Sequence, residues 1–142
     1  MTPLFALFLM LAPPVVSSLD QVKADPNPDH RAKAAVDYAS VAERNAEAAY
    51  AKGETQNADA ELKNVEESME AAEEALVASH KTPGRNPNPY KYAELHSREL
   101  LTRLGDLEQK MDSSERSVIA GVKAKVQELH DAWFEGIMGR KR

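Results

Sequence analysis

The feature that most constrains this chain is a small or apolar residue that recurs at alternating intervals of three and four residues through residues 28–138. In the first such segment every position of the repeat is small, and the repeat consists of Ala32, Ala35, Ala39, Ala42, Ala46, Ala49 and Gly53. A repeat that averages 3.5 residues keeps its members on one side of an α-helix, where they face a partner helix. No segment alternates between apolar and polar residues as a half-buried β-strand does. The pattern therefore predicts an all-α protein.

Three later segments carry the same repeat with larger side chains, and capping residues stand near the expected helix ends. Asn27-Pro28 and Asn88-Pro89 each offer an Asn N-cap followed by Pro at the first helical position, where its missing N–H costs nothing. The stretch 80–88 contains two prolines and a glycine and is predicted as a loop. The predicted helices span residues 28–52, 57–79, 89–111 and 113–138.

The lengths of the connections predict how these helices are arranged. Short connections within residues 28–79 and within residues 89–138 favour two antiparallel αα-hairpins. The longer loop lets the hairpins pack on each other, so the sequence predicts a single domain over residues 28–138, an antiparallel four-helix bundle. Two loosely docked hairpins, or a hairpin that dimerises, are the alternatives. Residues 19–27 are predicted to be a flexible linker.

The first eighteen residues have the features of a secretory signal peptide. Residues 4–12 are an unbroken apolar run, followed by Pro13-Pro14 and by a small-residue exit that ends at Ser18. An uncleaved membrane anchor is the alternative, but the apolar run is shorter than the roughly 20 residues that a spanning helix needs. We expect cleavage after Ser18, an exported protein that is periplasmic or secreted, and no transmembrane segment after cleavage.

Composition excludes several classes of function. The chain has no cysteine, so disulfides, thiolate metal sites and covalent c-type haem are excluded. The net charge is −5, and neither hairpin has the clustered Lys and Arg of a nucleic-acid-binding surface. We therefore expect no nucleic-acid partner and no cofactor.

No catalytic motif is present in the sequence. There is no glycine-rich phosphate loop and no paired-histidine zinc helix, and no serine is placed to be activated by a His–Asp pair. An acidic run in the second predicted helix could gather divalent cations loosely, but its members alternate with the apolar repeat and should be solvated; they are Glu61, Glu66, Glu67, Glu70, Glu73 and Glu74. The prediction is a non-enzymatic protein with no catalytic or metal site.

Two histidines of the second hairpin fall at the same level of the predicted bundle. In an antiparallel hairpin that turns near residue 112, His96 and His130 lie opposite each other along the helix axes. Their heptad positions are g and e, which flank opposite sides of the helix contact in an antiparallel pair. The sequence therefore predicts Glu94, rather than His96, as the neighbour of His130.

The same register gathers aromatic and basic residues at one end of the bundle. Tyr, Trp and Arg are the residue types enriched at binding hot spots. The alternative is that the aromatic side chains cap the core and the basic tail, residues 139–142, is solvated. The candidate interaction surface consists of Arg85, Tyr90, Tyr92, Trp133, Phe134, Arg140, Lys141 and Arg142.

The second half of the chain also carries a set of short motifs. They are Arg85-Asn86-Pro87, Tyr90-Lys91-x-Ala93-Glu94-Leu95, Arg98-Glu99-Leu100-Leu101-x-Arg103-Leu104, Val126-Gln127-Glu128-Leu129-His130-Asp131 and Gly136-Ile137-Met138-Gly139. Together they resemble an uncharacterised family of small, exported, helical bacterial proteins. The resemblance covers about residues 83–142, and the first hairpin resembles the family only in its general character. It implies export and helical structure, and it implies no activity.

These observations favour a non-enzymatic exported protein that binds another macromolecule, as an adaptor or a chaperone-like factor. The alternative is a structural, envelope-associated protein that its basic tail holds to an anionic surface. An enzyme or ligand carrier has the least support from the sequence. The oligomeric state is left open.

Overall fold

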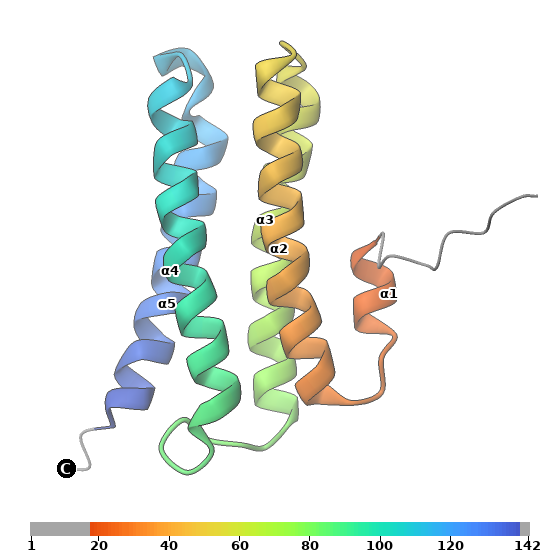
Figure 1. The fold of residues 1–142 in the computed structure, drawn as a ribbon, viewed down its shortest axis with the longest axis vertical. Helices are drawn as coiled ribbons and strands as arrows, with labels where there is room; N and C mark the ends of the chain where they lie inside the picture. The colour runs from red at the N-terminus through yellow and green to blue at the C-terminus, as the bar shows by residue number, and fades with distance from the viewer. Residues whose placement is uncertain (1–17, 140–142) are drawn as a thin grey trace, which may run out of the picture.

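The computed structural model describes residues 18–139, whose arrangement is shown in Figure 1. In chain order the elements are α1 (Leu19–Lys23), α2 (Pro28–Ala51), α3 (Thr55–Ala78), α4 (Pro87–Lys110), the 3-10 turn η1 (Ser113–Glu115) and α5 (Ser117–Met138). Apart from Ser18 and Gly139, the predicted signal peptide and basic tail lie outside the described residues.

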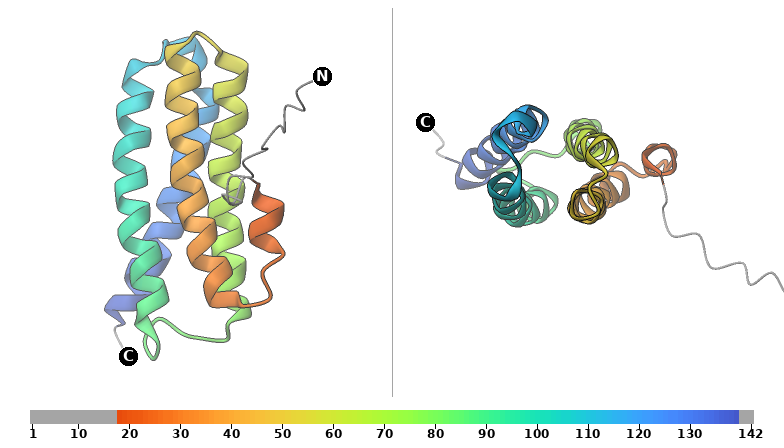
Figure 2. Two further views of the ribbon diagram at one scale, coloured as in Figure 1. Left: turned by 45° about the vertical axis from the view of Figure 1, so that its right-hand side comes forward. Right: turned by 90° about the horizontal axis from the view of Figure 1, so that it is seen from above.

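The four long helices pack antiparallel to their neighbours as a bundle (Figures 1 and 2). Helix α2 pairs with α3 and α4 pairs with α5, and the view from above in Figure 2 shows the two pairs side by side with α1 outside the α2–α3 pair. Contacts between α2 and α4 and between α3 and α5 join the hairpins. The predicted antiparallel four-helix bundle built from two αα-hairpins is therefore confirmed.

Side-chain capping explains the start of α2, whereas α3, α4 and α5 begin without a side-chain cap hydrogen bond. The Asn27 side chain accepts hydrogen bonds from the N–H groups of Asp29 at 2.9 Å and His30 at 3.3 Å, as predicted for the start of α2. Gly53 follows α2 with φ of 77°, a left-handed conformation that only glycine adopts without strain. Helix α4 begins at Pro87, two residues earlier than predicted, because either proline of this stretch suits a first helical turn. Helix α5 begins four residues later than predicted, because η1 takes up the intervening turn.

The segment predicted as a flexible linker begins with the short helix α1. The Ser18 hydroxyl caps it by accepting a hydrogen bond from the Gln21 N–H at 3.3 Å. Val22 is buried against the first hairpin, since α1 contacts both α2 and α3. A helix of five residues is too short to produce a periodic pattern, which is why the sequence did not indicate it.

The core consists of the predicted repeats. The six alanines of the α2 repeat are all buried, and Leu62, Met69 and Leu76 of α3 are fully buried. Alanine lets two helix axes approach closely, so α2 and α3 make by far the densest contact in the bundle. Each helix pair that joins the two hairpins makes fewer contacts than the helix pair within either hairpin. Over residues 18–139, no helix combines the length and apolarity needed to cross a bilayer.

Polar contacts hold the two hairpins together at several levels, and we call this the inter-hairpin interface. The Tyr50 hydroxyl of α2 accepts a hydrogen bond at 3.2 Å from the backbone N–H of Asp112, which directly precedes η1. The Tyr92 hydroxyl of α4 donates to the carboxylate of Asp37 in α2. The Trp133 indole N–H of α5 donates to Glu73 Oε2 of α3 at 2.5 Å. The interface is therefore more polar than the alanine-rich contact inside the first hairpin.

Candidate functional site

One end of the bundle brings together four parts of the chain that are distant in sequence. The first turns of α2 and α4, the last turns of α5 and the α3–α4 connection, residues 79–86, all lie there (Figure 1, bottom). We call this the loop end. It is where the sequence predicted an interaction surface.

A pocket of about 340 Å³ opens at the loop end between the first turns of α2 and α4. Its walls are mainly apolar surface, and a few polar and charged groups line it as well. The lining residues are Asp29, His30, Ala32, Lys33, Val36, Lys81, Asn88, Pro89, Tyr92 and Ala93. An apolar concavity with a few polar groups is the usual form of a binding site.

The charges of this pocket are only partly neutralised. The Lys81 ammonium pairs with the Asp29 carboxylate, whose Oδ1 is buried without a hydrogen-bond partner in the described chain. Lys33 makes no ion pair with any described residue, and its Nζ lies 5.2 Å from the centroid of the Tyr92 ring. Burial, together with the Asp37 carboxylate, raises the pKa of Tyr92 to about 12, so its hydroxyl stays protonated. The pocket therefore presents one uncompensated cation beside an aromatic face.

The aromatic residues of the predicted interaction surface divide into two groups. Tyr90 is 7% exposed and Trp133 is 2% exposed, so both belong to the core. The Tyr90 hydroxyl donates to the Lys81 carbonyl at 2.8 Å, which ties the connection to α4. The alternative interpretation, in which aromatic side chains cap the core, therefore describes these two residues. They are not available to a partner while the bundle is folded.

The remaining residues of the predicted surface differ in their surroundings. Tyr92 is partly buried and lines the pocket, Phe134 is 43% exposed on α5, and Arg85 is exposed on the α3–α4 connection. The tail residues of the prediction, Arg140, Lys141 and Arg142, lie outside the described residues. Tyr92, Phe134 and Arg85 thus remain as candidate contact residues at the loop end.

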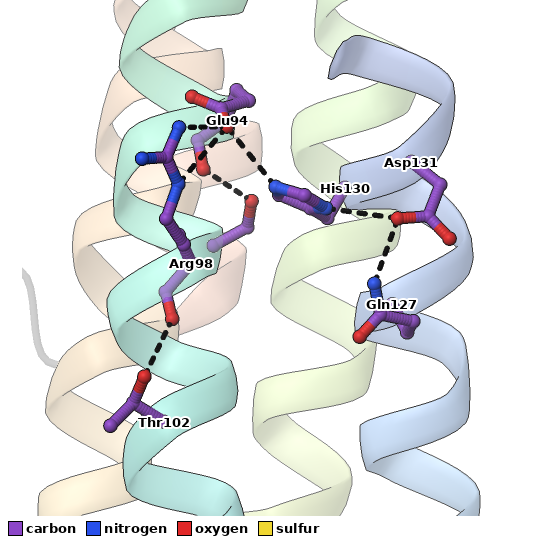
Figure 3. Close-up of polar contacts among 7 residues, drawn as sticks. Glu94, Arg98, Thr102, Gln127, His130 and Asp131 are labelled. Atoms are coloured by element: carbon purple, nitrogen blue, oxygen red, sulfur yellow. Dashed lines mark hydrogen bonds and ion pairs between the residues drawn. The ribbon is translucent and has the colours of Figure 1, made fainter. Parts of the chain in front are cut away.

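A polar network also crosses from α4 to α5, as Figure 3 shows. Glu94 Oε1 lies 3.1 Å from His130 Nε2 and also accepts hydrogen bonds from the Arg98 guanidinium. His130 Nδ1 lies 3.0 Å from Asp131 Oδ1, which also accepts a hydrogen bond from Gln127 at 2.8 Å. The predicted proximity of Glu94 and His130 is confirmed.

The network has a clear electrostatic character. A histidine can donate from both ring nitrogens only when it is protonated, and here each nitrogen faces a carboxylate oxygen. Burial alone would raise the pKa of Glu94, but Arg98 and His130 outweigh burial and hold it below its ordinary value. The hydrogen bonds from His130 and Gln127 lower the pKa of Asp131 as well. The arrangement therefore joins α4 to α5 through the contact between Glu94 and His130.

The surroundings of the two histidines show what else they contact. No serine or threonine hydroxyl of residues 18–139 is hydrogen-bonded to His130. The His96 ring packs against the Tyr92 ring at an interplanar angle of 44°, with centroids 4.1 Å apart. Its Nδ1 lies 3.8 Å from a carboxylate oxygen of Glu99. Within the described part of the chain, no three His, Asp or Glu side chains are grouped so as to hold a metal ion.

Sequence reasoning missed a buried carboxyl group in α2. Glu43 is fully buried, and neither of its oxygens has a hydrogen-bond partner among the described residues. It follows directly after Ala42 of the alanine repeat, in a segment that is otherwise rich in charged residues. The signal that could have found it is a second stripe at intervals of seven residues, in which Val36, Glu43 and Tyr50 share one side of the helix.

Comparisons with known proteins add no functional assignment. No protein-family model matches the chain, and comparison with curated proteins and with solved structures found no similar protein. The resemblance of residues 83–142 to an uncharacterised exported family therefore stays a hypothesis. Function has to be inferred from the geometry above.

Proposed function

We propose that this protein is a non-enzymatic binding protein whose loop end captures a segment of another protein. The pocket between α2 and α4 takes an apolar side chain of that partner, and Lys33 pairs with a neighbouring carboxylate of the partner. The observation that carries the proposal is an apolar pocket of about 340 Å³ with an uncompensated lysine at the Tyr92 ring.

The size and lining of the pocket suit a single large side chain. Binding pockets for small groups begin at roughly 300 Å³ and are lined mainly by apolar surface with a few polar groups. The pocket has two lysines against one aspartate, and the Asp29 charge is already paired with Lys81. An acidic partner segment with an aromatic or aliphatic residue therefore matches both features. An adaptor would bind one such partner, and a chaperone-like factor would bind many.

Export of this protein, predicted from residues 1–18, would place the binding reaction outside the cytoplasm. The alternative, attachment of the basic tail to an anionic envelope surface, depends on residues outside the described range. Deleting Arg140, Lys141 and Arg142 separates the two functions, because pocket binding should survive the deletion and tail-mediated attachment should not.

Peptide selection on residues 19–142 tests the proposed chemistry. We expect enriched peptides to carry an aromatic or large aliphatic residue next to Asp, Glu or the terminal carboxylate. Binding should weaken with added salt, because the contact to Lys33 is solvent-accessible and therefore screened. Enrichment of basic peptides, or of sequences with no apolar residue, would be incompatible with the proposal.

Matched variants locate the binding site. Lys33→Glu reverses the charge at the pocket, and Lys63→Glu makes the same change at an exposed position of α3 that does not line it. A photo-crosslinking residue at Asn88, in the pocket, should capture the selected peptide, whereas one at Lys52, at the opposite end of α2, should not. The proposal fails if both positions capture the peptide equally, or if the two charge reversals weaken binding by the same factor.

A further inference from the structure

One side of the second hairpin, α4–α5, is left uncovered by the rest of the described chain. The view from above in Figure 2 shows α1 on the first hairpin, on the side away from α4 and α5, and Val22 of α1 is buried there. Tyr92 and Arg103 contact α2 from α4, and Trp133 contacts α3 from α5. The opposite sides of α4 and α5 therefore face away from the first hairpin. We call this surface the outer face of the second hairpin.

A second repeat at intervals of three and four residues runs along the outer face on each helix. Such a spacing keeps its members on one side of the helix. Its members, all of which are exposed, are Lys91, Leu95, Arg98 and Thr102 of α4 and Gln127, Asp131, Phe134 and Met138 of α5. Figure 3 views this side of the hairpin, with α2 and α3 behind α4 and α5. Because the two helices are neighbours, the two stripes form one continuous surface.

The outer face carries most of the exposed apolar surface. Of the five large apolar side chains that are exposed within residues 18–139, three lie here: Leu95 is 54% exposed, Phe134 is 43% exposed and Met138 is 63% exposed. All three lie in the half of the hairpin nearer the loop end, where α4 begins and α5 ends. Exposed apolar side chains that are grouped and rimmed by polar groups are typical of protein–protein contact surfaces.

The charges of the outer face differ in sign between its two helices. The charged members of the α4 stripe, Lys91 and Arg98, are basic, and the charged member of the α5 stripe, Asp131, is acidic. Arg98 pairs with Glu94 of its own helix, but its side chain is 60% exposed. Asp131 contacts the neighbouring His130 and is 55% exposed. Both charges can therefore contact a second group on another molecule.

We propose that the outer face binds the same face of a second copy of this chain, about a two-fold axis parallel to the helices. This axis places α4 of each copy beside α5 of the other, so each basic stripe lies on an acidic one. A two-fold axis that crosses the helices would place α4 on α4 instead, with Lys91 and Arg98 opposite like charges. Self-association through one patch is the form of contact that a two-fold axis requires, and the charges select the parallel axis.

The apolar residues also meet in this arrangement. A parallel axis keeps each residue at its own level along the bundle, so α4 and the other copy's α5 pair at the same levels as α4 and α5 within one hairpin. The two helices run antiparallel, and helical side chains lean toward the N-terminus of their own helix, so facing side chains lean toward each other. Leu95 then packs near Phe134 of the other copy, and Arg98 lies near its Asp131.

The dimer does not depend on the function proposed for the loop end. The residues that line the pocket between α2 and α4 do not include any member of the outer face. Association therefore leaves the pocket of each copy open, and the parallel axis brings both loop ends to the same end of the dimer. Binding of a peptide and association of the chain can fail or succeed separately.

Complementary charge reversals test the proposed axis. In the Arg98→Glu protein each dimer would place two glutamates opposite Asp131, and in the Asp131→Lys protein each dimer would place two lysines opposite Arg98. We expect either protein alone to associate at least about tenfold more weakly than the protein with its natural sequence. A mixture of the two should associate as strongly as the natural protein, because the mixed dimer has an opposite-charge pair at both contacts.

Sedimentation equilibrium of residues 19–142 from about 1 μM to about 1 mM measures each association. We expect the average mass of the natural protein to rise from one chain toward two over this range. The proposal is overturned if that mass stays at one chain, if either charge reversal leaves association unchanged, or if the mixture associates no better than its components. Circular dichroism beforehand confirms that each protein is folded.

A second pair of variants tests the apolar contact and does not rely on the charge reversals. Phe134→Ser removes an exposed apolar side chain from the outer face, and Val77→Ser removes one from α3, on the first hairpin. We expect Phe134→Ser to weaken association at least about tenfold and Val77→Ser to leave it unchanged. Equal effects of the two substitutions would contradict a contact through the outer face.

Discussion

Replacing Trp133 by alanine tests whether the aromatic cluster at the loop end holds the bundle together. The side chain is almost completely buried, and its indole N–H donates to Glu73 across the inter-hairpin interface. Removing a buried tryptophan side chain costs about 3–5 kcal/mol. Glu73 is partly exposed, so its carboxylate regains water and the lost hydrogen bond adds little. We therefore expect Trp133→Ala to lower the free energy of unfolding by about 3–5 kcal/mol.

A loss of this size is large for a bundle of this length. Small domains are stable by about 5–15 kcal/mol, so the variant should unfold at a much lower urea concentration. Circular dichroism is the suitable assay, because the variant lacks the only tryptophan of the chain. Trp133→Phe keeps most of the apolar surface and removes the N–H, so we expect it to cost about 1–2 kcal/mol.

The exposed neighbour Phe134 provides the matched control. It is the next residue of α5 and is far more exposed than Trp133, so Phe134→Ala should change stability by no more than about 1 kcal/mol. If Trp133→Ala leaves the urea midpoint unchanged, or if both alanine variants lose the same stability, the assignment of Trp133 to the core is refuted. If Trp133 instead belonged to a free interaction surface, Trp133→Ala would weaken partner binding without unfolding the protein.

Three further predictions concern charge and packing. The pKa of Glu43 is about 8 in the folded protein and 4.5 when unfolded, so the free energy of unfolding should fall as pH rises between these values. The fall should be at most about 1.4 kcal/mol per pH unit. Glu43→Gln should flatten this profile in denaturation experiments. The pKa of Glu94 is lowered instead, so the stability that its carboxylate contributes is present at neutral pH and is lost as acid protonates it. Glu94→Gln should therefore lower the free energy of unfolding by about 1–3 kcal/mol at neutral pH, and the two proteins should become equally stable in acid. Ala39→Leu adds bulk at a fully buried position of the densest helix contact and should cost about 1–3 kcal/mol, measured by thermal unfolding. A small effect would contradict the tight packing of α2 on α3.

Much of the fold could be predicted because its signals are local and periodic. The alanine repeat of α2 alone identifies a helix and the side on which it packs, and all six alanines are buried in the structure. Asn27 marks the start of α2 because its side chain accepts hydrogen bonds from the first N–H groups of the helix. Gly53 marks the end because the backbone there has a positive φ. Short connections then determine that consecutive helices run antiparallel. None of these inferences needs knowledge of which helix lies opposite.

Part of the candidate site could also be predicted, because the register of one hairpin follows from its turn. Placing Glu94 beside His130 required only the position of the turn and the heptad positions of the two residues, and the 3.1 Å contact confirms it. The same register gathered the aromatic residues at one end. The two that are buried, Tyr90 and Trp133, also continue the three-four repeats of their helices. The contact of Trp133 with Glu73 of the other hairpin did not follow from the register.

The sequence by itself therefore determined the helices, their inward-facing repeats, the pairing within each hairpin and the end at which aromatic residues collect. Only the tertiary structure decided the burial of Glu43, the contact of Trp133 with Glu73, the position of α1 and the pocket between α2 and α4. The physical reason is that these features depend on groups outside the main repeats or on contacts between the two hairpins. Whether a flank faces water or another helix depends on how the two hairpins dock, and docking is set by contacts between residues far apart in the chain.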